Sequence, residues 1–181
     1  MPTPPSTALH PPPLGEKTVA GIPWRYGDPE SAFEWGDTLG EGSRSLVRAA
    51  TRVQPPPPGS TGAPQGTRCA VKVLSKTHPR FSALDARSEV EAHAAAAVCP
   101  DAVTLHEVWE DDDAVYLVQA ACDGGELYER VRAQGRLPEP DAAAAVAAVL
   151  RLLAHMHAGG WVHRDVKLEN FMYAGVKDGG G

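Results

Sequence analysis

The sequence is poor in cysteine and has no excess of positive charge, and each shortage argues against a class of protein. Its three cysteines, Cys69, Cys99 and Cys122, are odd in number and lie far apart, without the close pairing typical of a metal site. This usage fits a reduced compartment. The 17 lysines and arginines are outnumbered by 23 aspartates and glutamates, so the formal net charge is −6 and nothing favours nucleic-acid binding.

Long apolar runs and targeting signals are also lacking. No uninterrupted apolar run approaches the roughly 20 residues that are needed to cross a bilayer. The N-terminus lacks the charged and then apolar pattern of a secretory signal, and Pro2 stands where N-myristoylation needs glycine. We therefore expect a cytoplasmic protein that does not engage a membrane.

Length and composition predict one globular domain that carries additional segments. A chain of 181 residues with 43% hydrophobic residues is long enough to bury an adequate core. The first 32 residues are rich in proline and predict a disordered tail. Trp24 and Tyr26, in the second half of that tail, are equally compatible with a linker and with a segment that packs on the domain.

The remaining pattern predicts an α+β fold. Residues 103–109 and 115–119 alternate in polarity around an acidic turn, which predicts an antiparallel strand pair. Helices are predicted at residues 82–98, 126–134 and 140–158 from alanine content, apolar spacing and flanking glycine or proline. Residues 54–68 contain four consecutive prolines, so this stretch predicts a loop inserted between two strands. A tolerated surface insertion is favoured there over a polyproline ligand.

The most informative stretch is the polar run His163-Arg164-Asp165-Val166-Lys167-Leu168-Glu169-Asn170. Its spacing suits phosphoryl transfer, which needs a positioned nucleophile and charges placed around a negative transition state. Asp165 would accept the proton of a substrate hydroxyl, and Lys167 would offset charge that develops on the phosphate. Asn170 offers a side-chain oxygen to Mg²⁺, a cation that prefers oxygen ligands.

Further motifs precede this run in a consistent order. The stretch from Leu39 to Val47 contains Gly40 and Gly42 and predicts a glycine-rich hairpin that lets the backbone approach phosphates. Lys72 lies inside the apolar strand Cys69-Ala70-Val71-Lys72-Val73-Leu74, where a charge is costly unless it is paired. On the predicted helix, Glu89 and Glu91 are the carboxylates that could pair with Lys72. Glu91 points to another face and is interpreted as a surface charge.

Together these motifs resemble a eukaryotic-type protein kinase from about residue 33 to residue 173. The run Gly124-Gly125-Glu126-Leu127-Tyr128 and the ending Glu169-Asn170-Phe171-Met172 are similar to the calcium/calmodulin-regulated and calcium-dependent serine/threonine group. Lys167, two residues after Asp165, favours serine/threonine over tyrosine specificity by the same resemblance. The sequence contains no EF-hand loop, and it leaves the role of calcium and calmodulin open.

The resemblance implies a site for ATP and Mg²⁺ and a protein substrate. It implies an antiparallel strand lobe with one main helix at residues 33–122, hinge included, followed by the first part of a helical lobe at residues 123–181. Gln119 would be the gatekeeper, the Ala120 carbonyl and the Cys122 amide would face adenine, and Glu126 would lie near the ribose. The nucleotide-binding residues implied by the resemblance are Leu39, Gly40, Gly42, Val47, Ala70, Lys72, Ala120, Cys122 and Glu126. The catalytic ones are Lys72, Glu89, Asp165 and Lys167, with Asn170 as a metal ligand.

The sequence also departs from the kinase pattern. No Asp-Phe-Gly and no Ala-Pro-Glu follows Asn170, and Asp178-Gly179 is a poor substitute because no Phe separates the two residues. We therefore expect this chain to be a kinase fragment, incomplete at its C-terminus, with negligible activity of its own. The alternatives are an inactive kinase-like binding module or decoy, and a non-functional product. An exposed apolar face on helix 140–158 is the predicted contact for a partner.

Overall fold

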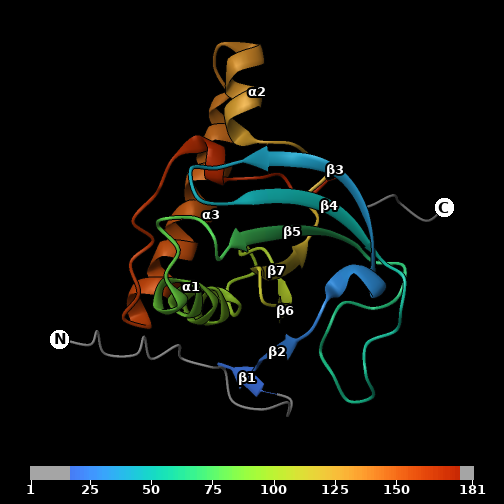
Figure 1. Cartoon of the computed structure of the whole chain (residues 1–181). Coiled ribbons are helices and arrows are strands. Elements are labelled where there is room, and N and C mark those ends of the chain that lie inside the picture. Colours follow the sequence, from blue (N-terminus) through green and yellow to red (C-terminus); the bar gives the residue numbers. More distant parts are fainter. Residues whose placement is uncertain (1–16, 176–181) are drawn as a thin grey trace.

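The computed structural model describes residues 17–175, which form one mixed sheet and three α-helices (Figure 1). The strands are β1 (Lys17–Val19), β2 (Ile22–Tyr26), β3 (Phe33–Glu41), β4 (Leu46–Arg52), β5 (Arg68–Ser75), β6 (Leu105–Glu110) and β7 (Ala114–Ala120). The helices are α1 (Ala83–Ala96), α2 (Leu127–Gln134) and α3 (Glu139–Ala158), with short 3₁₀ turns η1 (Pro29–Ser31) and η2 (Leu168–Asn170). The strand order is β1-β2-β6-β7-β5-β4-β3. The predicted α+β class is confirmed.

Strands β3 to β7 form the predicted antiparallel lobe. Each neighbouring pair among them is antiparallel, and β7 is paired with β5 over the whole length of β7. Because side chains alternate across a strand, the sheet buries two separate clusters. One cluster contains Phe33, Val71 and Val118, and the other contains Val90, Val108 and Leu117 beneath α1.

Helix α1 begins where its sequence predicts. Ser82 is the N-cap, and its hydroxyl accepts a hydrogen bond from the Asp85 amide at 3.2 Å. Its buried residues are Ala86, Val90 and Ala96, so one narrow face of small side chains meets the sheet. Glu91 pairs with Arg87 at 2.9 Å one turn away, which confirms that it points away from Lys72.

The predicted disordered tail was too long. Residues 17–31, which fall inside the predicted tail 1–32, form β1, β2 and η1; residues 1–16 lie outside the described part of the chain. Strand β2 pairs in parallel with β6, so the sheet is mixed rather than purely antiparallel. The physical reason is that Val19, Ile22 and Trp24 pack against the buried cluster beneath α1, which offsets the entropy cost of ordering the segment.

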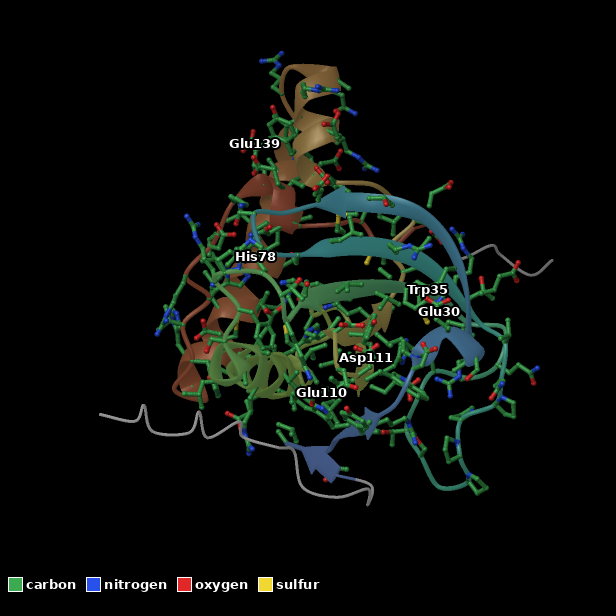
Figure 2. All side chains as sticks on the ribbon, in the orientation of Figure 1. Glu30, Trp35, His78, Glu110, Asp111 and Glu139 are labelled. Carbon is green, nitrogen blue, oxygen red and sulfur yellow. The ribbon has the colours of Figure 1, made fainter. Side chains whose placement is uncertain are left out.

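Polar contacts also fasten β2 to the sheet. Trp24 Nε1 donates to Glu110 Oε2 at 2.8 Å, and the Gly27 amide donates to the Glu110 carbonyl at 2.8 Å. Figure 2 shows the Glu110 and Asp111 side chains close together, where β6 ends. Tyr26 donates its hydroxyl proton to Asp112 in the same turn.

The proline-rich stretch predicted as an insertion forms the loop between β4 and β5. It packs on the sheet, because Gly62 and Ala63 are buried. Beneath it, the fully buried Glu107 on β6 pairs with Arg25 of β2 at 2.9 Å and with Arg52 of β4. Arg25 also donates to the Ser60 hydroxyl in the insertion at 2.5 Å. One buried carboxylate therefore joins the N-terminal strand, the sheet and the insertion.

Helix α3 confirms the predicted helix and its exposed face. Val146 and Leu150 are 57% and 59% exposed. The helix as a whole is long and apolar enough to cross a membrane by length and composition, although no uninterrupted apolar run reaches that length. One such helix is weak evidence for a membrane span. Arg151 near its middle pairs with Asp101 at 2.7 Å and ties α3 to the loop after α1.

Candidate active site

Lys72 and Glu89 meet in the structure. Lys72 lies on β5 and Glu89 on α1, and Lys72 Nζ is 2.6 Å from Glu89 Oε1. Their side chains are 29% and 37% exposed, so the pair sits at the edge of the core and is open to a ligand. Strand β5 sets the direction of Lys72, because Val71 and Lys72 point to opposite faces and Val71 is fully buried. The predicted contact is present, while its catalytic role stays a prediction.

The glycine-rich hairpin joins β3 and β4. Gly40 is opposite Val47, and the Gly42 amide donates to the Ser45 carbonyl at 2.8 Å to close the turn. A Cβ at Gly40 would meet no atom within 4 Å, so the backbone there is open to an approaching group. Ser45, which replaces the third glycine of the motif, lies against Gly42, where a Cβ would come within 3.2 Å of its Oγ.

The hinge follows β7. Ala70 and Val47 are half-buried on neighbouring strands, and Leu39 is 57% exposed. Within residues 17–175 the Cys122 amide has no hydrogen-bond partner, so this donor fits the predicted contact with an adenine edge. Burial raises the pKa of the Cys122 thiol, and neighbouring Asp123 adds to that effect, so the side chain is a poor nucleophile.

Three residues of the run 163–170, the predicted catalytic loop, form one hydrogen-bonded cluster. Asn170 Nδ2 donates to the Asp165 carbonyl at 2.6 Å and to Asp165 Oδ2 at 2.9 Å, which leaves the amide oxygen Oδ1 as the atom for a cation. Lys167 Nζ is 3.0 Å from Asp165 Oδ2. The hydrogen bond from Asn170, followed by that from Lys167, lowers the pKa of Asp165 below its ordinary value. Asp165 therefore stays ionised at neutral pH, as a proton acceptor must.

Arg164 has an unusual backbone. Its φ is +65°, the left-handed region that non-glycine residues rarely occupy. Backbone strain of this kind is found mostly at functional sites. It persists only where the surrounding contacts hold the backbone in place. Here the Asp165 amide donates to His163 Nδ1 at 3.3 Å, and the His163 ring stacks on Phe171 at 6.2 Å between centroids.

Backbone pairing places the loop beside the hinge. The Leu127 amide donates to the Phe171 carbonyl at 2.8 Å, and the Tyr173 amide donates to the Gly125 carbonyl at 2.9 Å. Gly124 makes this approach close, because a Cβ there would lie 2.5 Å from Tyr173 Cβ. Glu126, the predicted ribose contact, is part of this bridge through Met172. Sequence reasoning did not predict the structural roles of Gly124, His163 and Phe171.

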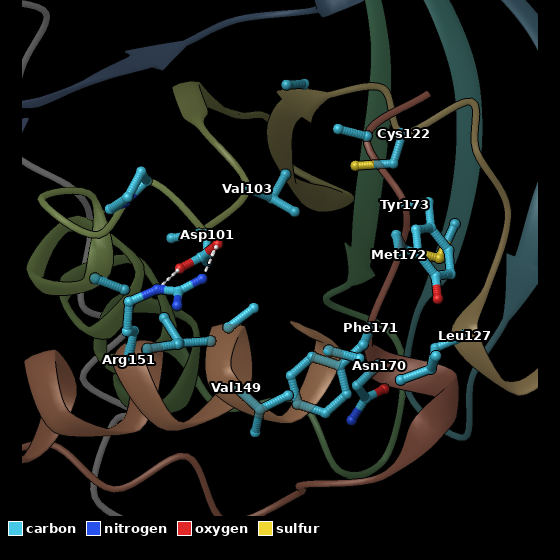
Figure 3. A pocket seen from close by; sticks show the side chains of 18 of the residues that line it. Asp101, Val103, Cys122, Leu127, Val149, Arg151, Asn170, Phe171, Met172 and Tyr173 are labelled. Atoms are coloured by element: carbon cyan, nitrogen blue, oxygen red, sulfur yellow. Dashed lines mark hydrogen bonds and ion pairs between the residues drawn. The ribbon is translucent and has the colours of Figure 1, made fainter. Parts of the chain in front are cut away.

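A hollow of about 840 Å³ opens between α1, α3 and the loop (Figure 3). Asn170 and Phe171 border it on one side, and the Arg151–Asp101 pair lies on another. Of the predicted nucleotide-binding residues, Ala120 and Cys122 line this hollow, whereas Leu39 joins Cys122 in a smaller pocket of about 280 Å³ at the outer edge of the hinge. Cys122 therefore borders both hollows.

The predicted site residues thus come together in three groups. The first is the Lys72–Glu89 pair with the glycine-rich hairpin, the second is the hinge with Glu126, and the third is the cluster of Asp165, Lys167 and Asn170. An ammonium near phosphates, an open backbone donor and an ionised aspartate are the groups that position a nucleoside triphosphate and a hydroxyl acceptor.

Comparison with known proteins identifies the same family that the motifs of the sequence resemble. The protein kinase domain family matches residues 33–178. Calcium-dependent protein kinase 8 of Oryza sativa subsp. japonica is 35% identical over 148 residues, which are 81% of this chain and 26% of that protein. Calcium-dependent protein kinase 8 of Arabidopsis thaliana is 38% identical over 148 residues, again 81% and 26%. Calcium-dependent protein kinase 9 of Oryza sativa subsp. japonica is 44% identical over 110 residues, which are 60% and 19%.

The chain thus spans about a quarter of the length of the curated relatives it matches. The matched region begins at the first residue of β3 and takes in the glycine-rich hairpin, the Lys72–Glu89 pair, the hinge and the catalytic loop. This chain belongs to the protein kinase domain family, and within that family it is similar to the calcium-dependent group of serine/threonine kinases.

Proposed function

We propose that this chain contributes the strand lobe, hinge and catalytic loop of an ATP-dependent protein serine/threonine kinase, which transfers the γ-phosphate to a protein hydroxyl. The observation that carries the proposal is the cluster in which Asn170 and Lys167 both contact the Asp165 carboxylate. Asp165 would orient the substrate hydroxyl and accept its proton, and Lys167 would stabilise charge on the transferred phosphate.

Lys72 would hold the α- and β-phosphates of ATP while Glu89 keeps its ammonium in place. The hairpin backbone at Gly40 and Gly42 would cover the phosphates, and the Cys122 amide would face adenine. The Asn170 Oδ1 atom fits a Mg²⁺ ion, which would neutralise phosphate charge when bound.

Phosphotransfer by the 181-residue chain alone should be negligible. The sequence contains no Asp-Phe-Gly, the motif whose aspartate holds Mg²⁺ in protein kinases. Neither a binding module nor a decoy is favoured by any contact among the described residues, and a partner on the exposed face of α3 stays a prediction. A cytoplasmic location is part of the proposal, since reduced cysteines fit it.

Nucleotide binding tests the proposal most directly. We expect MgATP to raise the melting temperature of the chain, and Lys72→Ala should abolish that rise because the phosphates lose their cation. Lys76→Ala is the matched control: Lys76, the residue just beyond β5, pairs with Glu110 and should matter to stability rather than to nucleotide. An MgATP shift that survives in Lys72→Ala would contradict the proposed site.

Activity provides a second test. Purified chain incubated with γ-labelled ATP and a serine/threonine peptide should transfer no more phosphate than Asp165→Asn does. Robust phosphorylation that depends on Asp165 would show that the expectation of negligible activity is wrong, while confirming the role of Asp165.

A further inference from the structure

Helix α1 has few side chains of its own with which to hold its position. Its buried residues are Ala86, Val90 and Ala96, whereas the larger Leu84 and the nearby Val98 are 74% and 76% exposed. Small side chains bury little apolar area, so such a helix depends on large side chains from its neighbours. Glu89 directly precedes Val90 on the helix. Packing that holds Val90 therefore also places the backbone of Glu89, whose carboxylate meets Lys72.

Leu74, Leu105 and Leu117 of the sheet supply some of these large side chains, and the N-terminal strands supply others. Val19, Ile22 and Trp24 pack against the same buried cluster that contains Ala86 and Val90. Strand β1 lies next to α1, and β2 continues along the edge of β6 (Figure 1). Phe81, just before α1, packs against this cluster as well.

Strand β2 is itself held firmly. Trp24 pairs with Val108 in the parallel register and donates Nε1–H to Glu110, while the next residue, Arg25, pairs with the fully buried Glu107. Glu110 is held in turn by Lys76 at 2.8 Å. The neighbouring residues Trp24 and Arg25 therefore face opposite sides of the sheet, Trp24 towards the cluster beneath α1 and Arg25 towards Glu107, so the strand is held on both faces.

We propose that β1 and β2, through Ile22 and Trp24, are a positioning element that holds α1 where Glu89 pairs with Lys72. Residues 17–26 lie outside the matched kinase region, which begins at residue 33, yet they support its nucleotide site. The inference rests on the proposed function only where it assumes that the Lys72–Glu89 pair binds a nucleotide. The support of α1 by β1 and β2 does not depend on that function.

Hydrogen exchange of the full 181-residue chain tests the support directly. Trp24→Ala should raise amide exchange in α1 by about tenfold or more, because the cluster that holds Val90 loses the side chain packed against it, while β4 and β5 keep their protection. Trp24→Leu retains apolar bulk but not the hydrogen bond to Glu110, and it should preserve most of the protection in α1. Tyr26→Ala, on the same strand, is the control that removes a contact with Asp112 and should leave α1 unchanged.

Nucleotide affinity in two backgrounds separates positioning from general stability. In the wild type, Trp24→Ala should weaken MgATP binding about fivefold, a coupling of the size expected for contacting groups. In a Glu89→Ala background the same substitution should have no further effect, because the pair through which it acts is gone. Equal loss of affinity in both backgrounds would overturn the proposal.

Failure of the positioning role can be distinguished from failure of the proposed function. Unchanged α1 exchange in Trp24→Ala, or exchange that rises equally in every strand, overturns the positioning role. Absence of MgATP binding by the wild type counts against the proposed function alone, since the exchange measurement still decides whether β2 supports α1.

Discussion

The strand lobe and the catalytic loop carry the two halves of the proposed site, and they are held in opposite ways. In the lobe, Lys72 and Glu89 come from a strand and a helix that stand on two buried clusters. In the loop, Asp165 is 63% exposed, and its partners Lys167 and Asn170 lie within five residues of it. The lobe therefore depends on long-range packing, whereas the loop depends on local hydrogen bonds and one backbone bridge.

This difference explains why the two regions respond to different changes. Loss of a buried group in the lobe should be costly, because a desolvated charge or a cavity remains. Loss of an exposed group in the loop should change local chemistry and leave the fold nearly unchanged.

The largest effect should follow Glu107→Ala. The substitution leaves the buried Arg52 and the half-buried Arg25 without their shared carboxylate, which should cost about 3–5 kcal/mol of the free energy of unfolding. Urea denaturation followed by tryptophan fluorescence would measure it. The matched control is Glu91→Ala, whose exposed pair with Arg87 should be worth only about 0.3–0.5 kcal/mol. Equal, small losses in both variants would contradict the view that buried contacts dominate the lobe.

The next largest effect should follow Gly124→Ala, which disrupts the backbone bridge between the hinge and the loop. The added Cβ would lie 2.5 Å from Tyr173 Cβ and 2.7 Å from the Tyr173 carbonyl oxygen, so the segments must separate. Overpacking of this kind costs about 1–3 kcal/mol. Amide exchange at Leu127 and Tyr173 should rise sharply. Gly40→Ala, where the same Cβ meets nothing within 4 Å, should leave these amides protected; the reverse result would refute the argument.

A smaller effect is a loss of stability of the strand lobe at acid pH. Burial lowers the pKa of both His93 and His106 below the ordinary 6.5. A lowered pKa means that the unfolded chain takes up protons first, so stability is full above pH 6.5 and is lost as the pH falls through the folded values. We expect the free energy of unfolding to decrease from pH 7 towards pH 5. His93→Gln should make that slope shallower, and an unchanged slope would exclude His93 as a contributor.

The smallest effect on stability, and the sharpest on chemistry, should follow Asn170→Ala. The Asn170 hydrogen bond is the main cause of the lowered pKa of Asp165, so its loss should raise that pKa towards its ordinary value of 3.8. NMR titration of the Asp165 carboxyl carbon would measure the change. Lys167→Ala should raise it less, because Lys167 is the second cause. Neither variant should alter the unfolding transition; a large loss of stability would blur the contrast between loop and lobe.

The elements of the kinase region were largely predictable, because their signals are local. Ser82, the alanine-rich stretch and the flanking glycines and prolines predicted the helices to within a few residues. The alternation around Glu110 predicted β6 and β7. The pairing of Lys72 with Glu89 was predicted from the order of motifs, and the contact is present.

The N-terminal strands were not predictable in the same way. Residues 17–32 follow a proline-rich run and were predicted as part of the tail, with Trp24 and Tyr26 equally compatible with a linker and with a segment that packs on the domain. Trp24 is informative only when Glu110 and the cluster beneath α1 are known to lie beside it, 86 residues further along the chain. Glu107 is likewise informative only when its partners Arg25 and Arg52 are known, because in the sequence it is one more charge in an alternating strand.

The sequence by itself determined the cluster of Asp165, Lys167 and Asn170, because their spacing needs only local backbone geometry to bring their side chains together. Only the tertiary structure decided how the parts are supported. The parallel pairing of β2 with β6, the burial of Glu107 between two arginines and the close approach of Gly124 to Tyr173 all join distant segments. Contacts of that kind arise from packing after the chain has folded back on itself, and no short pattern of residues encodes them.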